Sequence, residues 1–164
     1  MLKELLKNKR SLIIQEWIQS IIETYPVVTS KFLGQQKNRF ANPVGFTITQ
    51  CTEKLFDQII EDKNIEEIKT TLLDLIKIRA VQNFTPSEAV GFVFSLKMIL
   101  RNMFEKEISD KNSFKELINI ESKIDCTAIG AFDLYMEARE KVFQLKINEV
   151  KARLSHDNKQ GTIG

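Results

Sequence analysis

The chain has 164 residues, of which 43% are hydrophobic and 28% charged, enough apolar material for one core and too much for a disordered chain. Its 6 glycines and 3 prolines are too few for the many turns of a β-sandwich, which favours long helices. The 24 basic and 22 acidic side chains alternate along the chain, so a net charge of +2 predicts no field that would collect nucleic acid.

The first predicted helix covers residues 2–24, where apolar side chains recur at spacings of three and four and form one buried stripe. Pro26 ends it, because a residue that precedes proline is pushed out of the helical region. A second helix is predicted from Pro43 to about Glu61. The Asn42 side chain can accept a backbone N–H of its first turn, and proline suits its first position.

A third helix is predicted from Asn64, which resembles a start signal, toward Val81. The next one starts at a capping box, in which Thr85 caps the amide of Glu88 and the Glu88 side chain reaches back to the amide of Thr85. Its body, as far as Phe104, is apolar nearly all round. This pattern predicts a central helix that is packed on every side.

The last predicted helix opens at a second capping box, formed by Ser113 and Glu116, and runs to about Leu154. Some 40 residues would reach roughly 60 Å, about twice the diameter of a small domain, so the helix either breaks near Gly130 or projects. An apolar stripe continues through its second half, which favours a projecting end that pairs with a second copy of the chain. The dimer seam is predicted at Phe143, Ile147 and Val150.

These elements predict an all-α protein with a single helical domain over residues 1–154. Residues 155–164 are polar and lack a period, so we expect a disordered tail there. The longest uncharged run, residues 40–52, is too short to span a bilayer, and the N-terminus lacks the apolar region of a signal peptide. We therefore expect a cytoplasmic protein without membrane insertion.

The residues that carry chemistry predict no catalytic, metal or cofactor site. His156, the one histidine, lies in the polar tail, where no protein wall would orient it. Cys51 and Cys126 are 75 residues apart and belong to no metal-binding motif. Globin-type haem would need a histidine in mid-chain, whereas haem ligation by Cys or Met stays open. Phosphate-binding loops and di-iron motifs are also missing, so we expect no enzyme.

A few polar residues interrupt apolar runs, and two interpretations of them stay open. They either satisfy loop backbone groups and helix ends, or line a pocket or partner surface. The candidate polar binding surface consists of Arg39, Asn42, Arg79, Gln82 and Asn83.

Four segments together carry a resemblance to a known family. They are WIQSIIETYP from Trp17, RFANPVG from Arg39, RAVQNFTPSEAVGFVFSLK from Arg79, and the stretch from Ile124 to Arg139 with its continuation to Arg153. The chain resembles the N-terminal domain of the RsbT co-antagonist protein RsbRD over nearly its whole length. The runs RFANPVG and AVQNFTPSEAV are the most specific parts.

The resemblance implies a globin-like helical bundle without haem that dimerises and serves as the sensory or partner-facing part of a stressosome-type regulator. In multidomain relatives a long helix leads into a STAS domain, whose phosphoacceptor threonines have no counterpart here. We therefore expect a non-catalytic, homodimeric regulatory module that contacts a signalling protein. The alternative is a small-molecule sensor or carrier, with a small apolar ligand held between the helices at 44–60 and 90–104.

Overall fold

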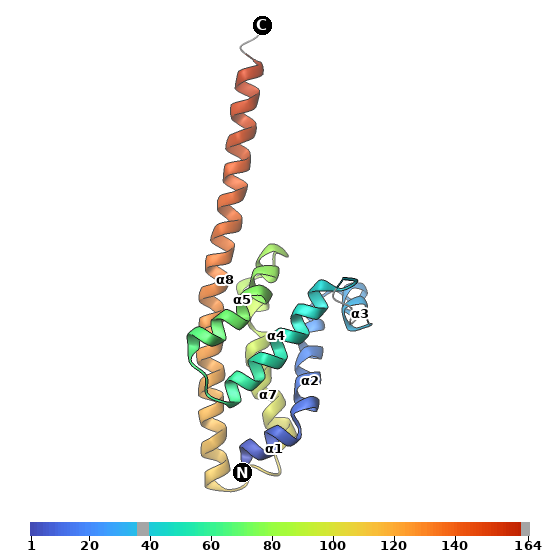
Figure 1. Cartoon of the computed structure of the whole chain (residues 1–164), viewed down its shortest axis with the longest axis vertical. Helices are drawn as coiled ribbons and strands as arrows, with labels where there is room; N and C mark the ends of the chain where they lie inside the picture. The colour runs from blue at the N-terminus through green and yellow to red at the C-terminus, as the bar shows by residue number, and fades with distance from the viewer. Residues whose placement is uncertain (36–39, 162–164) are drawn as a thin grey trace.

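The computed structural model describes residues 1–35 and 40–161, and within these ranges every regular element is a helix (Figure 1). The helices are α1 (Leu2–Asn8), α2 (Arg10–Ile22), α3 (Val27–Gln35), α4 (Pro43–Ile60), α5 (Ile65–Val81), α6 (Pro86–Val90), α7 (Phe92–Phe104) and α8 (Lys111–Gln160). The prediction of an all-α fold with a long C-terminal helix is confirmed. None of the described helices is long and apolar enough to cross a membrane.

The segment predicted as one helix over 2–24 is two helices, because the chain bends at Lys9. The bend lets α1 pack against the start of α8, where Leu2 and Leu6 are buried. The backbone N–H of Leu2 donates to Oε2 of Glu116 at 3.0 Å. A long-range contact therefore sets the break, which the apolar spacing did not reveal.

The predicted starts of α4, α5 and α6 are confirmed. The Asn42 side chain accepts the backbone N–H of Gly45 at 2.8 Å, and Asn64 caps α5 in the same way. Thr85 and Glu88 form the complete capping box at the start of α6. Each of these signals lies within four consecutive residues, so the local sequence is enough to determine it.

The composition after Thr85 predicted one central helix that is packed on every side, but the structure shows two helices with one face open. Gly91 separates α6 from α7, and α7 packs against α2 and α8 with one face only. On the open face Phe94 is 47% exposed and Met98 is 58% exposed. Apolar composition predicted burial here, but no neighbouring element of the described chain covers this face.

Helix α8 starts three residues earlier than the predicted capping box. Asp110 is the N-cap, since its carboxylate accepts the backbone N–H groups of Asn112 and Ser113. The Ser113 hydroxyl also donates to Asp110, at 2.6 Å. Glu116, the predicted partner of Ser113, bonds to the N-terminal segment instead.

The long helix projects rather than breaking. It runs unbroken through Gly130 for 50 residues, about 75 Å, and its second half stands clear of the other helices (Figure 1). Gly130 is buried against α5, and a Cβ there would lie 3.1 Å from Cδ1 of Ile65. The glycine therefore marks a close helix contact. The helix also continues over residues 155–160, where the sequence predicts a disordered tail.

The core lies between α2, α4, α5 and α7 on one side and the first half of α8 on the other. Trp17, Phe56 and Phe104 are fully buried aromatic side chains that fill it. The indole Nε1 of Trp17 donates to the carbonyl oxygen of Phe92 at 2.7 Å, which satisfies its one polar group in the interior. Ala138 is the last buried residue of α8. The packed part of the fold, which we call the body, therefore ends there.

Candidate functional site

The five residues of the predicted polar surface do not lie together. Arg39 falls outside the described residues. Asn42 is 1% exposed, since it caps α4 and donates to the carbonyl oxygen of Leu33 at 3.0 Å. The other three, Arg79, Gln82 and Asn83, do come together, at the end of α5 and the turn that leads to α6. We call residues 79–84 the α5–α6 corner.

Arg79 is fully buried, although it was predicted on a polar surface. Its Nη1 and Nη2 donate to Oγ1 of Thr24 at 3.2 and 3.0 Å, and Nη1 lies 3.5 Å from the carbonyl oxygen of Glu88. These acceptors are a hydroxyl and a carbonyl group, not a carboxylate. Within the described part of the chain, Nε has no hydrogen-bond partner. Burial lowers the pKa of this guanidinium.

Aromatic rings surround the guanidinium. Its central carbon lies 4.6 Å from the ring centre of Phe84 and 5.4 Å from those of Tyr25 and Phe92. Ring faces attract a cation, and this attraction is larger where water is excluded. The hydroxyl of Tyr25 donates to Oε1 of Gln82 at 2.9 Å, and burial raises the pKa of this tyrosine. Thr24 and Tyr25 follow α2 directly, so α2 holds one side of the corner.

Helix α8 holds the other side of the α5–α6 corner. The hydroxyl of Tyr135 donates to the carbonyl oxygen of Phe84. Nη1 of Arg139 donates to the carbonyl oxygen of Ala80 at 2.7 Å and to Oδ1 of Asn83 at 3.2 Å. Asn83 has a φ of 60°, in the left-handed region that non-glycine residues seldom adopt. Hydrogen bonds thus join the corner to α8 on one side and to the residues after α2 on the other.

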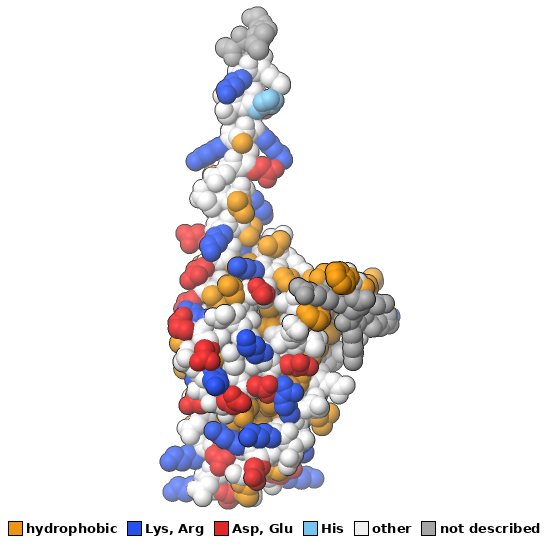
Figure 2. Space-filling model, viewed as in Figure 1, with side chains coloured by type: hydrophobic (Ala, Val, Ile, Leu, Met, Phe, Trp, Pro, Cys, Tyr) orange, Lys and Arg blue, Asp and Glu red, His pale blue; other side chains and the backbone are white. Residues whose placement is uncertain are grey.

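A second candidate feature is an exposed apolar stripe on one side of α8, interrupted between Ile118 and Ile129, which we call the outward face. Ile129, Met136, Phe143 and Val150 recur at every seventh residue, the spacing of paired helices. The face is completed by Phe114, Ile118, Phe132, Ile147 and Leu154. Except for the half-buried Ile147, these side chains are 45–65% exposed. Figure 2 shows some hydrophobic side chains among the charged ones on the projecting half.

The outward face lies opposite the side of α8 that packs on the body. At 3.6 residues per turn, Ile129, Met136 and Phe143 point away from the buried Ala131 and Ala138. The predicted seam residues Phe143, Ile147 and Val150 belong to this face. The predicted seam did not include Phe114, Ile118 and Ile129, although their spacing places them on the same side of the helix.

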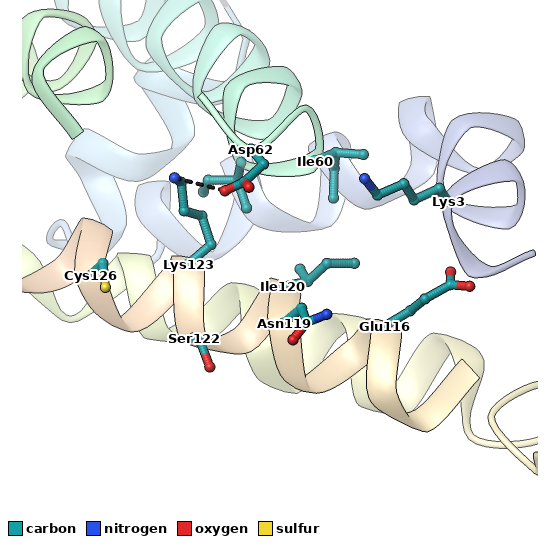
Figure 3. A pocket seen from close by; sticks show the side chains of 10 residues that line it. Lys3, Ile60, Asp62, Glu116, Asn119, Ile120, Ser122, Lys123 and Cys126 are labelled. Atoms are coloured by element: carbon teal, nitrogen blue, oxygen red, sulfur yellow. Dashed lines mark ion pairs between the residues drawn. The ribbon is translucent and has the colours of Figure 1, made fainter. Parts of the chain in front are cut away.

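A surface pocket of about 400 Å³ lies between α1, the end of α4 and the first half of α8 (Figure 3). Ile59, Ile60 and Ile120 line it together with charged groups of both signs. Lys123 points toward Asp62, and their Nζ and Oδ1 atoms are 2.8 Å apart. This lysine lowers the pKa of Asp62. The pair joins the α4–α5 turn to α8, and none of the predicted site residues lies here.

A larger cavity of about 750 Å³ lies between α2, α3 and α4. Its lining contains polar side chains such as Gln15, Thr49 and Gln50, and no residue of the 90–104 segment. This position differs from that of the apolar ligand pocket predicted between the helices at 44–60 and 90–104.

Burial raises the pKa of Cys51 to about 12, so its thiol stays protonated near neutral pH. No group of three metal-ligating side chains occurs among residues 1–35 and 40–161.

Comparison with known proteins identifies one family. The model described as the RsbT co-antagonist protein rsbRD N-terminal domain matches residues 12–150, a span that includes the α5–α6 corner and most of α8. A protein of Archaeoglobus fulgidus, described as uncharacterized, is 24% identical over 149 residues, which cover 88% of this chain and 87% of the relative. No solved structure matches the chain.

Proposed function

Because the chain belongs to the RsbT co-antagonist protein RsbRD N-terminal domain family, we propose that it is a non-catalytic regulatory module of stressosome-type signalling that acts through protein–protein contacts. In this proposal the module is cytoplasmic and homodimeric, its bundle is globin-like, and α8 carries the contacts. One observation supports it most directly: the outward face of α8 is apolar and largely exposed in the single chain from Ile129 to Leu154, and again at Phe114 and Ile118 near the start of the helix.

A second copy of the chain is the occupant that fits the outward face best. A single amphipathic helix that extends beyond its body gains no packing energy and is marginally stable in water. Pairing of two α8 helices around a two-fold axis brings identical stripes together, so each copy covers the other. Phe94 and Met98 on the open face of α7 would extend the same contact, since the neighbouring Lys97 and Arg101 already reach Asp125 and Glu121 of α8.

The projecting half of α8 is also the place where a signalling partner would dock. It lies farthest from the body, and charged side chains such as Glu149 and Arg153 flank its apolar residues. A change at the body would reach such a partner along a rigid helix. The partner's identity would follow from a pull-down with the full chain.

The test of the proposal is the mass of the full chain in solution. At tens of micromolar, light scattering coupled to size-exclusion chromatography should give twice the mass of one chain. Phe143→Asp should give a monomer, because it places a charge in the seam. Leu145→Asp is the matched control: Leu145 is 69% exposed and lies on the opposite side of α8. A monomeric wild-type chain would contradict the proposal, as would equal effects of the two substitutions.

The cavity between α2, α3 and α4 favours a second function, that of a small-molecule sensor. Its volume of about 750 Å³ falls in the range of small-molecule sites. Ligand binding to the folded state must raise the melting temperature. Native mass spectrometry without a co-purified ligand, together with no thermal shift from haem, flavins or fatty acids, would contradict this second function.

A further inference from the structure

We propose that the α5–α6 corner relays structural changes at the end of α2 to α8, and that Arg79 is the positioning residue of this relay. The inference rests on the proposed function, in which α8 carries the signal. It adds the route by which the body would control the helix.

The first link joins the end of α2 to the corner. Both hydrogen bonds that Arg79 makes to a side chain end on Oγ1 of Thr24. Tyr25 makes a second connection, since its hydroxyl bonds to Gln82 and its ring lies against the Arg79 guanidinium. A displacement of Thr24 and Tyr25 therefore acts on Arg79 and Gln82 at once.

The second link joins the corner to α8 at the point where the helix leaves the body. Tyr135 and Arg139 bond to backbone carbonyl groups of Phe84 and Ala80. Ala138, the last buried residue of α8, lies between them in sequence. Beyond this point no described element of the chain supports α8, so these bonds fix where the free part of the helix begins.

The buried polar groups of the corner keep their positions only while neighbouring residues support them. A buried guanidinium with an unpartnered Nε and no carboxylate among its hydrogen-bond acceptors is costly to keep in the interior. The left-handed backbone at Asn83 adds strain in the same turn. If Thr24 moves, the hydroxyl that accepts two of Arg79's hydrogen bonds moves with it. The corner is therefore the joint in this fold that should respond most to a change at α2.

Hydrogen–deuterium exchange of the full chain tests the relay. In Arg79→Met, which keeps much of the side-chain volume but removes the guanidinium, exchange should rise about tenfold in peptides that cover residues 80–84 and 135–145. Helix amides exchange faster where tertiary support is lost, so the free part of α8 should begin earlier. Arg101→Met is the control, because Arg101 also contacts α8, at Glu121, but does not touch the corner.

The outcomes separate a relay from a structural role. If exchange rises equally throughout Arg79→Met, the residue serves global stability alone and the relay is refuted. Unchanged exchange over 135–145 in a folded variant refutes it as well. If Arg79→Met does not fold, Thr24→Val removes the hydroxyl that accepts from Arg79 and should raise exchange in the same peptides by a smaller factor. A monomeric wild-type chain would contradict the proposed dimer, but the exchange experiment would still test the relay.

Discussion

Single polar side chains in this protein stabilise the fold in ways that their position in the sequence does not reveal. Asn42 was placed on a binding surface and also identified as a helix cap, and in the structure the cap accounts for its burial. Its oxygen accepts from Gly45 and its nitrogen donates to Leu33, so it ties the end of α3 to the start of α4. Such a residue holds elements together rather than binding a partner.

Replacement of Asn42 by alanine should destabilise the fold by about 2–3 kcal/mol, because a cap is lost and buried backbone groups lose their partners. Urea unfolding followed by circular dichroism measures the difference. Asn64→Ala, which removes an exposed cap of the same kind at α5, should cost only about 1 kcal/mol. Equal costs at the two positions would show that the burial of Asn42 adds nothing.

At the scale of elements, the start of α8 depends on a charge. The Asp110 carboxylate accepts hydrogen bonds from the hydroxyl and backbone N–H of Ser113 and from the N–H of Asn112, which hold its pKa below the ordinary value of 3.8. A lowered folded pKa means that the ionised carboxylate stabilises the folded state above the unfolded pKa. This contribution is lost as the pH falls through the folded pKa.

Asp110→Asn should therefore lower the melting temperature at pH 6, and its difference from the wild type should shrink as the pH falls below about 3.8. The asparagine keeps a neutral oxygen for the two backbone N–H groups but loses the charge and the acceptor of the Ser113 hydroxyl. Asp74→Asn, which removes the same charge in the middle of α5, is the control. A difference that stays constant down to pH 2.5 would contradict the assignment.

For the molecule as a whole, folding and association should be linked. Half of α8 projects from the body, and its apolar side chains are exposed in the single chain. If a second copy covers them, only folded chains associate. By mass action, the apparent stability of the folded chain then rises with protein concentration. A protein that kept this face uncovered would expose an apolar stripe of the kind that marks interaction sites.

A hundredfold increase in protein concentration should accordingly raise the melting temperature by roughly 4 °C, since about 2.7 kcal/mol per dimer is about 1.4 kcal/mol per chain, which corresponds to a few degrees in a domain of this size. Differential scanning calorimetry at the two concentrations measures the shift. Phe143→Asp should show no such dependence. A melting temperature independent of concentration in the wild type would argue against a dimer coupled to folding.

Several features followed from the sequence alone. The caps at Asn42, Asn64 and Thr85 depend on groups three residues apart, so no distant contact is needed to recognise them. The length predicted for the last helix left a break near Gly130 or a projecting end, and the apolar stripe in its second half favoured the projecting end and placed Phe143 and Val150 in the seam. Local geometry converts such spacings directly into faces and ends of helices.

Only the tertiary structure decided where those faces and polar groups lie. The bend at Lys9 depends on the packing of α1 against α8, and the open face of α7 depends on the absence of a covering helix in the described chain. Arg79 is buried because Thr24, Tyr25, Phe84 and Phe92 converge on it from separate segments. Spacing along one helix cannot report such partners, because burial depends on which distant segments meet.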